Sequence, residues 1–265
     1  MTHLIDPSWW QVAGMAALLL TVAVISWRLG LGLEAGLAQG VARTALQLGL
    51  LGLILRGVFA ADDWWAVVGM LAIMGTVASF TAARRQQVQV AGLVAAAAAG
   101  IALGSMGVVL FLTQGILRID PWYEPHYLIP FGGMLFGNAM NTMALAFDRL
   151  AGELGTRKET IEAALALGAD APEAAFPALR AAVRAATLPL VLELMTVGLV
   201  QLPGTMTGLI LGGADPGTAT RYQMLVMYAW VANSCFAVLI ALRIALRHYF
   251  TPDLALSPAV LKARG

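Results

Sequence analysis

The sequence predicts an all-α, polytopic integral membrane protein with about seven transmembrane helices. Of its 265 residues, 60% are apolar and 12% are charged, and the mean hydropathy is +0.79, values outside the range of soluble proteins. Seven apolar stretches are each long enough to cross about 30 Å of hydrocarbon as a helix. We therefore expect a single multi-pass transmembrane domain over residues 1 to 265, in a cytoplasmic (inner) membrane and in contact with lipid.

Interfacial aromatic residues mark the ends of several stretches, as Trp9, Trp10 and Trp27 do for the first. The weakest break lies around Glu34 and Gly36, so an even number of spans, with a kink at this point, is the alternative. The predicted spans are 8 to 27, 36 to 56, 64 to 82, 89 to 113, 128 to 147, 187 to 212 and 222 to 246, with a polar cytoplasmic segment over 148 to 186.

The positions of Lys and Arg predict the orientation, because cytoplasmic loops carry an excess of these residues. Assigning alternate span ends to two sides leaves Arg56, Arg118 and Arg221 on one side and twelve cations on the other. The N-terminus is therefore expected outside and the C-terminus inside. The twelve are Arg28, Arg84, Arg85, Arg149, Arg157, Lys158, Arg180, Arg184, Arg243, Arg247, Lys262 and Arg264.

The polar segment between the fifth and sixth spans is predicted to be ordered. Thr156 and Glu159 have the spacing of a capping box, and Gly168 is placed to close that helix in the left-handed conformation. Asp170 and Glu173 repeat the capping-box spacing and are expected to begin a second helix. The interval therefore predicts a short isolated helix followed by a longer one.

Glu162-Ala163-Ala164 followed by Gly168 resembles the E-A-A-x-x-x-G signature of ABC importer permeases, although no I-x-L-P follows it. In that family a short cytoplasmic coupling helix binds an ATPase subunit. The apolar residues of the predicted helix fall at i, i+3, i+4 and i+7 and form a stripe, while an amphipathic loop without a partner is the alternative. The candidate ATPase-coupling residues are Ile161, Glu162, Ala164, Leu165 and Gly168.

Two ionisable residues lie inside predicted spans, where each costs about 2.5 to 3.5 kcal/mol at the centre by insertion scales. Arg43 and Glu193 are each placed roughly 10 Å from the cytoplasmic end of their spans, at about 1.5 Å per residue. They are a candidate ion pair. The alternatives are that each extends separately to the interface, or that they act directly in transport.

Polar and helix-breaking residues mark a candidate substrate path. Gln47 shares a face of the second span with Arg43, and Pro203 with Gly204 is expected to break the sixth helix. Hydrogen bonds between neighbouring helices and a plain kink are the structural alternatives. The candidate path residues are Gln47, Asn138, Asn141, Thr142, Glu193, Gln201, Pro203 and Gly204.

No cofactor is expected on this chain, and the identity of any metal ligands is left open. The twelve methionines could serve a soft ion such as Cu(I), whereas a hard cation would want the oxygens of Glu193, Asn138 or Asn141. Methionine as core filler is the alternative. No G-x-x-x-x-G-K-[ST] motif is present, so the chain is not expected to be an enzyme, and ATP would be used by a partner. The composition does not imply nucleic acid binding.

Three segments together resemble the FetB (YbbM) family of iron-export ABC permeases, which includes plant aluminium-tolerance relatives. They are A-R-T-A-L-Q-L at 42 to 48, P-F-G-G-M-L-F-G-N-A-M-N-T at 130 to 142, and T-V-G-L-V-Q-L-P-G-T-M-T-G-L-I-L-G-G-A-D-P at 196 to 216. Gln201 stands where that family often has Ser, and Glu193 where an uncharged polar residue is expected. The resemblance implies a permease that works with a separate ATPase and exports a metal ion or a related small solute.

We therefore expect the transmembrane subunit of an ABC-type exporter, as a homodimer bound to two ATPase subunits, with iron as the favoured substrate. The alternatives are an ion-coupled secondary transporter, in which Arg43 and Glu193 would be a proton-linked pair, and a membrane scaffold without flux.

Overall fold

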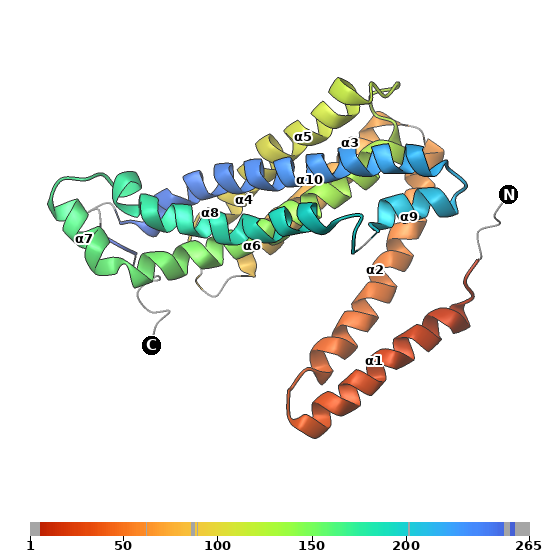
Figure 1. The fold of residues 1–265 in the computed structure, drawn as a ribbon, viewed down its shortest axis with the longest axis horizontal. Coiled ribbons are helices and arrows are strands. Elements are labelled where there is room, and N and C mark those ends of the chain that lie inside the picture. Colours follow the sequence, from red (N-terminus) through yellow and green to blue (C-terminus); the bar gives the residue numbers. More distant parts are fainter. Residues whose placement is uncertain are drawn as a thin grey trace. The chain divides into compact units, whose positions relative to one another are not determined.

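The computed structural model describes residues 6 to 61, 63 to 85, 88, 90 to 200, 202 to 251 and 255 to 257. Within these residues the regular structure is helical (Figure 1), and the one β-type contact is an isolated bridge between Phe250 and Leu256. The all-α prediction is therefore confirmed. The chain divides into two compact units, residues 1 to 62 with 211 to 214, and residues 63 to 210 with 215 to 265.

The first unit is a hairpin of two helices, α1 (Trp9–Leu29) and α2 (Glu34–Ala61). Gly30 and Gly32 adopt positive φ angles of 65° and 70° in the turn, which glycine allows at low cost. The buried Ser26 Oγ donates to Glu34 Oε1 at 2.9 Å and accepts from the Leu33 N–H at 3.0 Å. The chain therefore reverses here, and the kink that an even span count required is absent.

The second unit contains the remaining helices. Its fourth predicted span is one continuous helical stretch with two π-helical segments, η1 and η2, inside it. The elements are α3 (Trp64–Arg84), α4 (Leu93–Ala99), η1 (Gly100–Ser105), α5 (Met106–Leu110), η2 (Phe111–Ile116), α6 (Pro125–Thr156), α7 (Lys158–Ala166), α8 (Ala171–Thr196), α9 (Gly204–Leu211), α10 (Pro216–Ala245) and the short 3₁₀ helix η3 (Leu246–Tyr249).

Helix α6 is the centre of this unit and packs against α3, α8 and α10 (Figure 1). Asn233 Nδ2 donates to the Leu135 carbonyl and Tyr249 Oη to the Phe147 carbonyl, pairs that are 98 and 102 residues apart. This nearly constant offset shows that α6 and α10 run in the same direction, while α8, which follows α7, runs back along both of them. Small residues allow close approach: a Cβ added to Gly104 would lie 2.8 Å from the backbone nitrogen of Ala237.

Six helical stretches of the described part are long and apolar enough to cross a membrane. They correspond to the predicted spans one to four, six and seven. The helix at the sixth span, α8, begins at Ala171, whereas the predicted span begins at residue 187. The fifth predicted span, 128 to 147, lies inside the 32-residue helix α6, whose polar residues lower its hydropathy. The protein is thus a multi-pass membrane protein, and seven spans with an external N-terminus stay a prediction.

The polar segment is ordered, but its helices begin at other residues than predicted. Thr156 is the last residue of α6 and Arg157 is the N-cap of α7 without a side-chain cap, so the capping box of Thr156 and Glu159 is wrong. The C-terminal prediction is confirmed, because Gly168 has a φ of 95°. Its N–H bonds the Leu165 carbonyl and the Ala169 N–H bonds the Ala164 carbonyl, which is a Schellman motif. Asp170 Oδ1 accepts from the Glu173 N–H at 2.7 Å and begins α8 as predicted.

Candidate functional site

The break in the sixth predicted span is real and longer than the sequence suggests. Helix α8 ends at Thr196, and its last backbone bond joins the Val197 N–H to the Glu193 carbonyl at 2.9 Å. Gly198 then adopts a φ of 81°, and helix α9 begins at Gly204, directly after Pro203. Irregular backbone at membrane depth is tolerated where it is buried in protein or lines a cavity. The break is therefore the natural place to look for a site.

A pocket of about 440 Å³ lies beside this break. It is built from α6, the end of α8, the start of α9 and α10, so four separate segments of the second unit meet around it. One carboxylate, two carboxamides, a hydroxyl and an indole contribute its polar groups. The lining residues are Met134, Asn138, Glu193, Leu202, Pro203, Gly204, Thr205, Gln223, Val226 and Trp230.

The pocket brings together four of the predicted path residues, Asn138, Glu193, Pro203 and Gly204. Glu193 is half-buried and lies three residues before the end of α8, at the end remote from α7. It is level with the first half of α10, because Gln223 and Trp230 line the same pocket. Helix α8 thus extends well before the predicted start of the span at residue 187, and the depth of Glu193 in the membrane stays a prediction.

Gln223 is the residue that the sequence reasoning missed. It is buried, with 6% of its surface exposed, and its Oε1 accepts a hydrogen bond from the Met206 N–H at 3.2 Å. Met206 is the third residue of α9, whose first N–H groups have no partner within their own helix. Gln223 therefore fastens the short helix α9 to α10. The sequence signal that could have identified it is a carboxamide at the second position of the predicted seventh span, 222 to 246, directly after Arg221 and Tyr222.

A second pocket of about 220 Å³ lies on the other side of Pro203 and Gln223, which line both cavities. Its lining is mostly apolar and includes three methionines, Met206, Met224 and Met227. Thioethers are ligands for soft ions, whereas the larger pocket contributes a carboxylate and amide oxygens. Among the described residues no group of three or more His, Cys, Asp or Glu side chains could hold a metal ion.

The three predicted path residues of α6, Asn138, Asn141 and Thr142, lie in three different environments. Asn138 lines the pocket, and its Nδ2 donates to the Met134 carbonyl at 2.9 Å. Thr142 is buried one turn further on and donates to the Asn138 carbonyl at 2.9 Å. Asn141 is exposed, and its Oδ1 accepts from Arg85 Nη1 at 3.0 Å. Asn141 therefore belongs to a contact with the end of α3 and does not line the pocket.

For three predicted positions the structure does not test a place at the pocket. Gln47 and Arg43 are exposed within the first unit, and Gln201 lies outside the described residues. The ion pair of Arg43 with Glu193 would join the two units and stays a prediction.

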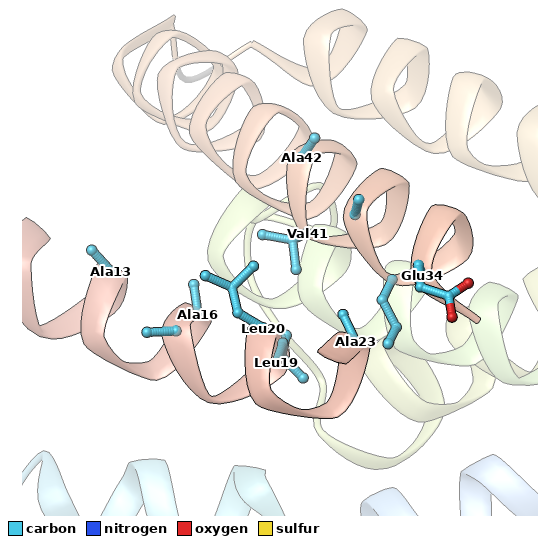
Figure 2. A pocket seen from close by; sticks show the side chains of 11 residues that line it. Ala13, Ala16, Leu19, Leu20, Ala23, Glu34, Val41 and Ala42 are labelled. Atoms are coloured by element: carbon cyan, nitrogen blue, oxygen red, sulfur yellow. The ribbon is translucent and has the colours of Figure 1, made fainter. Parts of the chain in front are cut away.

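The first unit contains its own pocket of about 350 Å³ between α1 and α2. Figure 2 shows that small and branched apolar side chains such as Ala16, Leu20 and Val41 point into it from the two helices, with Glu34 at one end. Glu34 is the one titratable residue of the lining, and its Oε1 already accepts from Ser26. This cavity reflects the loose packing of small residues and offers no set of converging polar groups.

The predicted coupling helix is present as α7, but its apolar stripe faces the protein itself. Ile161 is 1% exposed, Ala164 and Leu165 are half-buried, and α7 packs against α6 and α8. The prediction that this stripe is free to bind a partner is therefore wrong for Ile161. The most exposed apolar side chain of this end of the unit is Leu167, at 89%, in the turn that follows α7.

Glu162 is exposed on the outward face of α7, where Lys158 Nζ lies 3.7 Å from its Oε1. Gly168 is exposed in the turn. Both predicted positions are thus accessible, and with Leu167 they form the outward surface of this end of the unit.

Comparison with known proteins identifies relatives over nearly the whole length. Residues 9 to 250 match the profile of UPF0014, an uncharacterised protein family. The chain is 37% identical over 258 residues to a UPF0014 membrane protein of Synechocystis, covering 94% of this chain and 97% of the relative. It is 32% identical to Protein ALUMINUM SENSITIVE 3 of Arabidopsis thaliana, covering 90% and 86%. It is 31% identical to the Probable iron export permease protein FetB of Escherichia coli, covering 89% and 90%. No solved structure matches the chain.

Proposed function

This chain belongs to the UPF0014 family of membrane proteins, and we propose that it is the permease subunit of an ABC-type exporter. Its substrate is a metal ion, with iron favoured, because a relative that is 31% identical is named a probable iron export permease. A separate ATPase subunit drives the export.

The observation that carries the proposal is the pocket beside the broken helix. Its volume of about 440 Å³ exceeds what a bare ion fills, because one water takes about 30 Å³ of liquid volume. An ion with its first shell of waters therefore fits. The Glu193 carboxylate contributes the negative charge, and the carboxamides of Asn138 and Gln223 offer oxygens to the ion or to its waters. Hard cations prefer oxygen donors of this kind.

The partner ATPase is proposed to bind the end of the second unit formed by α7 and the turn after it. Leu167 in this turn and Phe176 near the start of the adjoining α8 expose 89% and 59% of their surface, and large exposed apolar side chains of this kind act as anchors at protein interfaces. Glu162 contributes charge at the rim. Because α7 packs on α6 and α8, a displacement of α7 by the ATPase would be transmitted to two helices that line the pocket.

Two copies of the chain are proposed to form the transmembrane part. In the first unit, Gln39, Arg43 and Gln47 lie four residues apart on one face of α2 and are exposed within that unit. Polar groups on a transmembrane helix are costly against lipid and stabilise contacts between helices. A second copy would cover this face.

The test is metal flux in sealed vesicles that contain the purified protein with and without its ATPase. The proposal predicts Fe²⁺ movement that requires both ATP and the ATPase. Movement driven by a proton gradient alone would indicate a secondary transporter, and no movement in the complete system would indicate a scaffold. Either result refutes the proposal.

A further inference from the structure

Buried polar atoms without a partner are concentrated on one turn of α10. Among the residues that the structure describes, four buried side-chain atoms have no hydrogen-bond partner: Ser105 Oγ, Trp230 Nε1, Asn233 Oδ1 and Ser234 Oγ. Three of these four belong to α10, within five consecutive residues. Native proteins rarely leave such groups unpaired, because each loses its hydration without compensation. Their concentration in one place calls for a functional explanation.

These atoms continue the polar lining of the large pocket. Trp230 is itself a lining residue, and Asn233 lies one turn further along α10. Asn233 is fully buried, and its Nδ2 donates at 2.8 Å to the carbonyl of Leu135, the residue next to the pocket-lining Met134. The polar positions from Gln223 to Ser234 are spread over about 16 Å along the helix, at about 1.5 Å per residue.

Beyond Ser234, on the side of α7, the same interface is closed by apolar side chains. Met143 and Phe147 of α6 and Ala237 and Ala241 of α10 are all 0% exposed. A Cβ added to Gly100 of η1 would lie 2.6 Å from the Ala237 carbonyl oxygen and 3.0 Å from the Met143 sulfur. The layer is therefore tightly packed, and an ion cannot cross it in this conformation.

The packing around this layer is of a kind that can shift. The segment that packs against α6 and α10 at this layer, η1, is π-helical, and π-helical turns are commonly found at functional sites. The contact with α10 is made by glycine and alanine, which lack long interlocking side chains. Movement of α6 against α10 would open the layer and expose the unpaired atoms of Asn233 and Ser234 to water.

We propose that Trp230, Asn233 and Ser234 form the inner part of the substrate path, and that the apolar layer beyond Ser234 is its closed inner gate. This inference rests on the proposed function. The stretch carries uncharged donors and acceptors only, which suit the water shell of a cation better than the bare ion. The cation therefore passes the gate in hydrated form and meets its first charge at Glu193 in the pocket.

The first test replaces Asn233 by an apolar side chain of similar size, Asn233→Leu, in the complete transporter. We expect Fe²⁺ flux into vesicles to fall at least tenfold, while the amount of protein is unchanged and its Tm changes little, since the loss of the bond to the Leu135 carbonyl is offset by removal of the unpaired Oδ1. The matched control is Ser79→Ala, which removes a buried hydroxyl of α3 that is already bonded to the Gly75 carbonyl at 2.7 Å. This control should keep wild-type flux.

The second test measures access of water to the gate. Ser234→Cys in a Cys235→Ser background is treated from the cytoplasmic side with a small cationic methanethiosulfonate reagent. We expect labelling to be at least tenfold faster during ATP turnover than without ATP, with no such change for Ser79→Cys.

The outcomes separate the gate from the proposed function. If the wild-type protein with its ATPase moves no metal ion, the proposed function and the gate fall together. If the wild type transports while Asn233→Leu transports equally well and Ser234→Cys stays unlabelled, only the gate is refuted. A loss of Tm that accounts for the whole loss of flux would likewise show that Asn233 is a structural residue.

Discussion

The hydrogen bond between Gln223 and α9 gives the sharpest quantitative prediction. Helix α9 has eight residues, too few to be stable in isolation, so its place beside the pocket depends on contacts with its neighbours. Gln223→Met keeps the size of the side chain but removes the Oε1 that accepts from the Met206 N–H. A buried N–H left without an acceptor costs about 1 to 3 kcal/mol.

Because every 1.4 kcal/mol is about tenfold in an equilibrium, we expect the open form of α9 to become roughly five- to hundredfold more populated. Native-state hydrogen exchange of the Met206 amide, followed by mass spectrometry, should accelerate by this factor, while exchange in α6 is unchanged. Metal ion affinity should fall as well, because Pro203 and Gly204 of this segment line the pocket.

Two control variants isolate the cause. Gln223→Glu retains an acceptor oxygen and should restore slow exchange at Met206. Thr207→Val removes the hydroxyl that donates to the Pro203 carbonyl at 3.2 Å at an exposed position and should leave Met206 unaffected. Unchanged exchange at Met206 in Gln223→Met would show that the bond does not hold α9, and the reasoning about the pocket wall would be wrong.

Three further predictions concern charge, docking and orientation. Glu193→Gln removes the charge of the pocket and should lower metal flux at least tenfold at an unchanged amount of membrane protein; flux at the wild-type level would move the site elsewhere. Leu167→Asp places a charge on a side chain that is 89% exposed, so we expect normal stability but loss of ATPase co-purification, and retention of the ATPase would exclude this surface as the dock. Single cysteines at Thr156 and Thr218 in a Cys235→Ser background should label from opposite faces of the membrane. Thr156 lies at the C-terminal end of α6 and Thr218 near the N-terminal end of α10, and the two helices run in the same direction. Labelling of both from one face would contradict the predicted topology.

The coupling region shows why a local pattern can be right about a helix and wrong about its face. The spacing of Ile161, Ala164 and Leu165 predicts a short amphipathic helix, and α7 is that helix. The same spacing does not say what covers the apolar stripe. In the structure α7 packs against α6 and α8, which cover Ile161. The exposed apolar side chain is Leu167, in the turn after α7.

The sequence alone determined the membrane class, the helix ends marked by Gly168 and Asp170, and the break at Pro203. Each depends on a few neighbouring residues: the class on hydropathy, the helix ends on a positive φ and a side-chain cap, and the break on the N–H that proline lacks. Only the tertiary structure decided which polar residues share a pocket. It separated Asn141, bonded to Arg85, from Asn138 in the pocket, and it added Gln223. Spacing along one helix shows which residues share its face, whereas convergence around a pocket depends on how α6, α8, α9 and α10 pack, and that is set by contacts between residues far apart in the chain.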